Sequence, residues 1–144
     1  MFKRIVSAYD GSKKSLEAFD YALGLAVMCS ANSAIPAELH VISVAQPPEP
    51  VEIVEMDAMI EYATQHYEDQ FKGLIAKAAA KNIEVTTKIA VGHPADQVLK
   101  FAKEINADLI VVGQRGGSKV ANWLLGDVSK RISSYASCSV LIVK

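Results

Sequence analysis

Residues 109–118 read Leu-Ile-Val-Val-Gly-Gln-Arg-Gly-Gly-Ser, an unbroken apolar run that ends in a cluster of glycines. A short apolar run without alternating polar residues is typical of a strand that is buried on both faces. Such strands belong to parallel sheets that helices cover on either side. The segment therefore predicts a central strand of an α/β domain.

The rest of the chain alternates between strand-like and helix-like segments. Further short strands are predicted at residues 5–8, 38–44, 84–91 and 140–143. Between them, apolar residues recur at helical spacing and predict four helices. The first starts at Ser12, the expected N-cap, and ends at the polar stretch 30–33. The others run from about Asp57 to Asn82, around Val98 to Ile105, and from Gly126 to Ala136. Strict alternation implies parallel strands with helices on both faces, so we expect one doubly wound domain over residues 1–144.

Composition and charge exclude several classes of protein. Fifteen basic and sixteen acidic side chains leave a net charge of −1, whereas nucleic-acid and membrane-surface binders carry a field of positive charge. The two cysteines, Cys29 and Cys138, form no CxxC pair and are expected to be reduced thiols. The sequence shows no signal-peptide pattern and no apolar run near the roughly 18 residues of a membrane span. We expect a soluble cytoplasmic protein with no nucleic-acid or membrane partner.

Two loops at the carboxyl ends of predicted strands stand out. The first follows the opening strand at Tyr9-Asp10-Gly11, and the second begins at Gly113. In open doubly wound sheets, ligands bind outside the carboxyl ends of the strands, where the winding direction reverses. If the two strands are neighbours, the two loops form one crevice.

The glycine-rich segment from Gly113 to Ser129 is the strongest candidate for a functional centre. Its glycines let the backbone turn sharply and approach a ligand closely, and a last helix that begins at Gly126 would present free N–H groups to an anion. It matches neither the GxxxxGK[ST] phosphate loop nor the GxGxxG dinucleotide fingerprint. From spacing alone, the alternative that these glycines only serve the turn and the helix start remains open.

At these residues the chain resembles the universal stress protein family. The resemblance rests on the spacing Gly113-x2-Gly116-x9-Gly126 closing on Ser129, and it extends over the whole chain. It includes the strand that ends in Asp10-Gly11-Ser12, the strand 39–42, the turn Gly92-His93-Pro94-Ala95 and the closing segment 137–143. The resemblance implies a flavodoxin-like sheet of five parallel strands in the order 3-2-1-4-5.

The resemblance also implies ATP binding, a role in stress survival, slow or absent ATP hydrolysis and a homodimer. Asp10 and the backbone of Ala8 and Val41 would hold the base. The ribose and phosphates would lie along Gly113, Arg115 and Gly116, and the phosphates would meet the helix start at Gly126, Val128 and Ser129.

One position departs from the family pattern. The family has Ser or Thr directly after the third glycine, and this chain has Asp127. Aspartate is a good N-cap, but two like charges 4 Å apart repel by about 1 kcal/mol in water and about 4 kcal/mol at an effective dielectric of 20. Bound Mg²⁺, or basic side chains such as Arg115 and Lys119, would offset this repulsion.

Three interpretations follow from these residues. The leading one is a dimeric ATP-binding stress protein with a regulatory role. The second is a dimeric interaction module whose crevice excludes phosphates because of Asp127. The third is a slow ATP hydrolase in which Asp10 or Asp127 helps to place Mg²⁺. In each case the apolar last strand, Val140 to Val143, leaves an edge that pairing with a second copy would cover.

The histidines share no metal spacing. His40 lies on an apolar strand and is interpreted as a core residue with satisfied hydrogen bonds. His93, at the mouth of a strand end, is a candidate for a ligand contact.

Overall fold

The computed structural model describes residues 1–46, 53–114 and 122–144, with side chains described for all of these except 53–55 and 122–127. The strands are β1 (Arg4–Ala8), β2 (Glu38–Ala45), β3 (Val85–Val91), β4 (Leu109–Gly113) and β5 (Ser139–Val143). The helices are α1 (Lys13–Ser30), α2 (Ile53–Ala79), α3 (Pro94–Glu104) and α4 (Asn122–Tyr135). Strands and helices alternate along the chain, as the sequence predicts.

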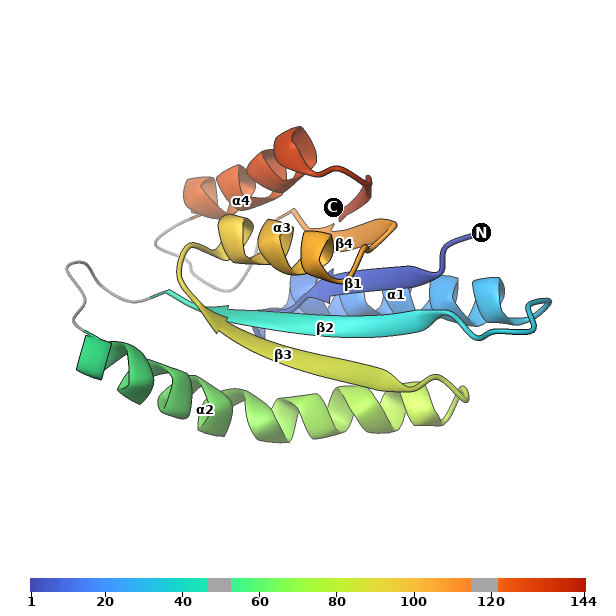
Figure 1. The fold of residues 1–144 in the computed structure, drawn as a ribbon, viewed down its shortest axis with the longest axis horizontal. Coiled ribbons are helices and arrows are strands. Elements are labelled where there is room, and N and C mark those ends of the chain that lie inside the picture. Colours follow the sequence, from blue (N-terminus) through green and yellow to red (C-terminus); the bar gives the residue numbers. More distant parts are fainter. Residues whose placement is uncertain (47–52, 115–121) are drawn as a thin grey trace.

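The strands form one sheet in the order β3-β2-β1-β4-β5, and every adjacent pair is parallel (Figure 1). The predicted flavodoxin-like order is therefore confirmed. Because β1 pairs with β2 on one side and β4 on the other, the winding direction reverses between β1 and β4. The two loops that the sequence singles out start at these neighbouring strands.

Two apolar layers hold the helices to the sheet. On one face, Phe19 of α1 and Phe71 of α2 pack against β-strand residues such as Val41. On the other face, Val98 of α3 and Ile132 of α4 pack against residues such as Ile42. The central strand β4 is buried along Leu109–Val112, as a strand covered on both faces must be.

The local start signal of α1 is confirmed. Ser12 is the N-cap, and its hydroxyl accepts a hydrogen bond from the Ser15 amide at 3.1 Å. An N-cap side chain of this kind satisfies one of the backbone donors that a helix leaves free at its start.

The predicted starts of two helices are wrong. Helix α2 begins at Ile53 instead of about Asp57, and α4 begins at Asn122 instead of Gly126. In α4, the apolar spacing Leu124, Val128, Ile132 continues across the glycine. One glycine inside a helix costs only about 1 kcal/mol relative to alanine, so it does not end a helix that such spacing supports.

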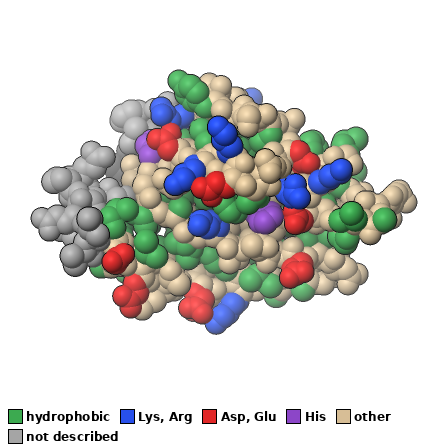
Figure 2. Space-filling model, viewed as in Figure 1, with side chains coloured by type: hydrophobic (Ala, Val, Ile, Leu, Met, Phe, Trp, Pro, Cys, Tyr) green, Lys and Arg blue, Asp and Glu red, His purple; other side chains and the backbone are tan. Residues whose placement is uncertain are grey.

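On the face formed by α3 and α4, acidic and basic side chains are interspersed (Figure 2). This mixture agrees with the near-neutral charge of the chain. Among the described residues on this face, the basic side chains therefore form no continuous field of the kind that nucleic-acid binders use.

Candidate functional site

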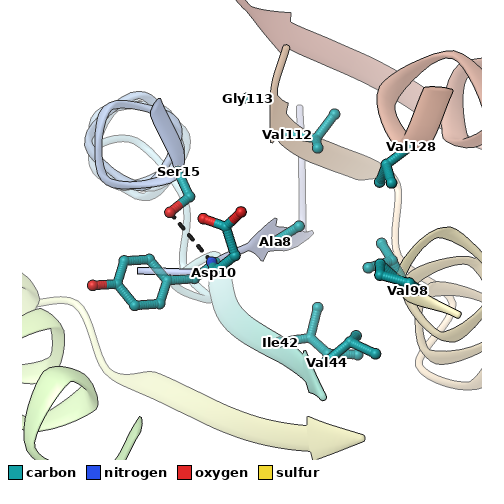
Figure 3. Close-up of a pocket in the computed structure, with 11 residues that line it drawn as sticks. Ala8, Asp10, Ser15, Ile42, Val44, Val98, Val112, Gly113 and Val128 are labelled. Atoms are coloured by element: carbon teal, nitrogen blue, oxygen red, sulfur yellow. Dashed lines mark hydrogen bonds between the residues drawn. The ribbon is translucent and has the colours of Figure 1, made fainter. Parts of the chain in front are cut away.

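A pocket opens where β1, β2 and β4 end, between the sheet edge and the helices α3 and α4 (Figure 3). Its empty space, including the open solvent at the mouth, is about 580 Å³. The residues that line it are Ala8, Tyr9, Asp10, Ser15, Ile42, Val44, Pro94, Val98, Val112, Gly113 and Val128. The structure thus brings the loop after β1 and the end of β4 to one crevice.

The loop after β1 carries the pocket's carboxylate. Asp10 is the only charged side chain among the described residues that line the pocket. One of its oxygens, Oδ1, accepts from the Ser12 amide at 2.9 Å, and its own amide donates to the Ser15 hydroxyl at 3.2 Å. Gly11 completes the turn with φ +85°, a conformation that side chains with a Cβ rarely adopt. The turn and the start of α1 therefore fix the backbone that holds Asp10.

The same loop is tied to β2. The Tyr9 amide donates to the Ile42 carbonyl at 2.9 Å, and the Ser43 hydroxyl donates to the Tyr9 carbonyl at 2.6 Å. Both backbone groups of Tyr9 are satisfied in this way, although the residue is only 8% exposed. The carboxylate of the following residue is consequently presented from a well-anchored backbone.

Gly113 ends β4 at the other side of the crevice. A Cβ at this position would lie 3.0 Å from the backbone carbon and oxygen of Lys14, at the start of α1. Gly113 does not have a positive φ, so space rather than conformation requires glycine here. Any larger residue would push the first turn of α1 away from the sheet, and Ser15 of that turn also lines the pocket.

The remaining wall is apolar. Ile42 and Val44 project from β2, Val112 from β4, and Val98 and Val128 from the covering helices around one hollow (Figure 3). A slot of this kind suits the flat faces of a ring system, and the Asp10 carboxylate at its side could orient such a ring.

The family resemblance assigns the backbone of Val41 to the base, and this stays a prediction; Val41 is not among the residues that line the pocket. Its side chain is fully buried in the layer that packs on α1 and α2, on the opposite face of the sheet. Successive residues of a strand point to opposite faces, so the neighbouring Ile42 reaches the pocket instead.

The structure places the proposed phosphate-binding residues in different positions relative to the pocket. Arg115 and Gly116 lie outside the described residues. Gly126 and Asp127 fall inside α4 rather than at its start, so their amides are not those of the first helical turn. Val128 lines the pocket, whereas Ser129 is 2% exposed and does not. The prediction that the last helix starts at Gly126 is thus wrong, and the phosphate-binding roles of these residues stay predictions.

Burial and charge raise the pKa of two tyrosines beside the Asp10 loop. For Tyr9, burial is the larger cause and the negative charge of Asp10 is the second. Burial and then the Asp10 charge likewise raise the pKa of Tyr67 on α2. Both phenols therefore remain neutral hydrogen-bond donors at physiological pH, close to the pocket's carboxylate.

The structure does not place the two histidines as the sequence suggested. His93 is exposed and does not line the pocket. His40 is largely buried against the edge of Phe101, with ring centroids 5.8 Å apart, but neither ring nitrogen has a hydrogen-bond partner among the described residues. The interpretation of His40 as a satisfied core residue is therefore wrong. Burial, as the larger effect, lowers the pKa of its imidazole, against an opposing effect of Glu38.

Sequence reasoning missed several residues of the pocket. Ile42 and Val44 belong to an apolar strand in which both faces look alike, so no pattern marks the pocket side. The helical spacing marks Val98 only as a helix residue, although α3 follows directly after β3 and must start at the same edge of the sheet. That placement is the one signal that could have assigned it to the pocket. Among the described ranges, no group of three or more His, Cys, Asp or Glu side chains is placed to hold a metal ion.

The fold and the pocket define a flavodoxin-like α/β protein with a cleft at the carboxyl edge of its sheet. The model of the universal stress protein family matches residues 1–144. The universal stress protein YxiE of Bacillus subtilis (strain 168) is 34% identical over 156 residues, and the match covers 100% of both chains. The chain belongs to the universal stress protein family.

Two solved structures illustrate the similarity in three dimensions. The universal stress protein UspA from Lactobacillus plantarum has a TM-score of 0.82 at 20% identity, covering 99% of this chain and 97% of that chain. A universal stress protein in complex with cAMP has a TM-score of 0.70 at 27% identity, with 99% and 97% covered. In the part of the chain that the structure describes, no helix is long and apolar enough to cross a membrane.

Proposed function

We propose that this chain binds an adenine nucleotide in the pocket at the ends of β1, β2 and β4, and acts in stress survival by binding and regulation rather than by fast turnover. The observation that carries the proposal is an apolar slot with one carboxylate at its side, Asp10. The similar universal stress protein in complex with cAMP supports the same ligand class. ATP is the nucleotide that the family pattern favours.

The described walls suit the base and the sugar. The apolar side chains of Ile42, Val112 and Val128 would cover the faces of the ring. The Asp10 carboxylate accepts hydrogen bonds, which matches the exocyclic amine of adenine. Gly113 also lines the pocket, and the ribose would lie beside it.

The number of phosphates separates the two leading interpretations. If Asp127 repels phosphate, affinity should fall from adenosine to AMP to Mg²⁺·ATP, because each added charge increases the repulsion. If Arg115 and bound Mg²⁺ compensate, ATP should bind at least as tightly as AMP. The substitution Asp127→Ser should improve ATP binding only if Asp127 repels the phosphates.

Calorimetric titration tests the proposal directly. We expect the wild-type protein to give binding heat with AMP or Mg²⁺·ATP, and the purified protein to release an adenine nucleotide on denaturation. Asp10→Asn keeps an oxygen for the Ser12 amide but replaces the second oxygen by a donor, so affinity should fall about tenfold or more. The matched control is Asp69→Asn on the exposed surface of α2, which should bind like the wild type.

Binding heat absent at millimolar adenosine, AMP and ATP would exclude the proposed ligand class. Equal affinities of the Asp10→Asn and Asp69→Asn proteins would show that Asp10 does not contact the ligand.

We further propose a homodimer through β5, on the contrast between the two sheet edges. The outer strand β3 exposes Thr86, Thr87 and Lys88, polar residues that discourage edge pairing. In β5 the half-buried residues 140–142 are all apolar and none is charged. Light scattering should give twice the chain mass of 15.5 kDa, and a monomer at micromolar concentration would contradict the proposal.

A further inference from the structure

The loop that carries Asp10 is held not only by the sheet but also by α2. The Tyr9 hydroxyl donates to Oε1 of Gln70 at 2.8 Å. The amide nitrogen of Gln70 donates to the His66 carbonyl of its own helix at 3.4 Å, which turns the amide oxygen toward Tyr9. The same oxygen lies against the turn, 3.1 Å from the position that a Cβ on Gly11 would occupy. One side chain of α2 therefore touches the loop on both sides of Asp10.

Packing around this contact leaves the Tyr9 ring little freedom. Tyr9 is 8% exposed, and the ring of Tyr67 packs edge-on against it with centroids 6.4 Å apart. Tyr67 in turn stacks on Phe71 at 5.9 Å. The charge of Asp10 acts on both phenols, which places all three groups in one neighbourhood.

None of the described residues of α2 lines the pocket. The geometry points to Gln70 as a positioning residue for ligand binding, which acts on Asp10 through the Tyr9 hydroxyl. The inference rests on the proposed function, because Asp10 is the group that would orient the adenine ring.

The physical reason is the cost of an unpaired buried hydroxyl. Without the Gln70 oxygen, the Tyr9 hydroxyl has to turn toward water to find an acceptor. Tyr9 and Asp10 are consecutive, so a shift of the Tyr9 backbone displaces the carboxylate directly. Sub-ångström displacement of a hydrogen-bond acceptor is enough to weaken an oriented ligand.

The test compares Gln70→Met, Tyr9→Phe and the double variant with wild type. Methionine has a similar length to glutamine but no strong acceptor, and Gln65→Met, an exposed residue of the same helix, is the matched control. Each single variant should weaken AMP binding by about three- to tenfold, and the double variant by no more than the larger single effect. The control should bind like the wild type.

A merely structural role predicts a different pattern. In that case Gln70→Met lowers the thermal midpoint, but the folded protein binds AMP with the affinity of the control, and the inference is overturned. Additive effects in the double variant would also overturn it. Should Gln70→Met fail to fold, Tyr9→Phe, which removes a single oxygen, carries the same comparison.

Amide hydrogen exchange separates failure of this inference from failure of the proposed function. The Ser12 amide is bonded to the Asp10 carboxylate, so its exchange rate reports the carboxylate's position without any ligand. If the wild type binds no adenine nucleotide, the proposed function fails. The positioning of Asp10 by Gln70 still stands if Gln70→Met raises Ser12 exchange about tenfold over Gln65→Met, and it is wrong if the two rates agree.

Discussion

Replacing Gly113 by alanine should destabilise the protein although alanine is ordinarily the better residue. Gly113 ends β4, and the added Cβ would lie 3.0 Å from two backbone atoms of Lys14 and 3.1 Å from its Cβ. Real Cβ atoms are seldom so close to a neighbour, and the neighbour here is the first turn of α1 rather than a flexible side-chain tip. The helix start must therefore move by a few tenths of an ångström.

Two opposing effects set the magnitude. Overpacking by one methyl group commonly costs about 1–3 kcal/mol, whereas removing a glycine from a strand regains roughly 0.5–1 kcal/mol. Subtracting the gain from the cost leaves a loss of up to about 2.5 kcal/mol in the free energy of unfolding, centred near 1 kcal/mol. For a chain of this size, a loss of about 1 kcal/mol lowers the thermal midpoint by roughly 2–8 °C.

Gly24 and Gly73 provide matched controls within helices α1 and α2. A Cβ at either position meets nothing within 4 Å. Alanine is favoured over glycine in a helix interior by about 1 kcal/mol, so both controls should be more stable than the wild type. The same substitution should thus have opposite signs at Gly113 and at the control positions.

Urea unfolding, followed by circular dichroism, measures these differences. The midpoint should shift down for Gly113→Ala and up for the controls, with an unchanged dependence of the free energy on urea. A Gly113→Ala protein as stable as the Gly24→Ala protein would refute the close approach of β4 and α1. Nucleotide affinity should fall as well, since the displaced turn carries Ser15 of the pocket.

Three further predictions concern buried polar groups. Because burial lowers the pKa of His40 in the folded state, the unfolded chain takes up the proton first as the pH falls through about 6.5, and stability is lost. His40→Phe should therefore lose less of its free energy of unfolding between pH 7.5 and pH 5.5 than the wild type, and equal losses in urea titrations would contradict this. Ser7 is fully buried and its hydroxyl has no hydrogen-bond partner among the described residues, so Ser7→Ala should be neutral or stabilising by up to about 1 kcal/mol. Ser43→Ala should lower the free energy of unfolding by about 1–2 kcal/mol because it removes the donor to the Tyr9 carbonyl. Equal urea midpoints of Ser7→Ala and Ser43→Ala would contradict both the unpaired Ser7 hydroxyl and the bonded Ser43 hydroxyl.

The local order of the fold could be predicted because its signals are local. Apolar runs mark buried strands, helical spacing marks the helices, and Ser12 caps α1 through residues three positions apart. The placement of Asp10 and Gly113 also followed, since Asp10 lies in the loop after β1 and Gly113 ends β4, two strands that end at one edge of a parallel sheet.

Other features depend on contacts that no local pattern encodes. In β2 both faces are buried, so the sequence does not distinguish Val41 from Ile42, and only the packing of the helices decides which one lines the pocket. Helix α4 continues through Gly126, and whether a helix does so depends on its tertiary packing and not on the local sequence. The bond from Tyr9 to Gln70 joins residues 61 positions apart.

The sequence by itself thus determined the alternation of strands and helices, the parallel sheet and the edge at which a ligand would bind. Hydrophobic periodicity and turn-forming residues act over a few positions, so they can be recognised directly in the sequence. Tertiary structure alone decided which side chains face the pocket and how α2 holds the Asp10 loop. Both features depend on contacts between helices and strands that are far apart in sequence. The shape of the pocket and the partners of its hydrogen bonds are defined only once the helices have packed on the sheet.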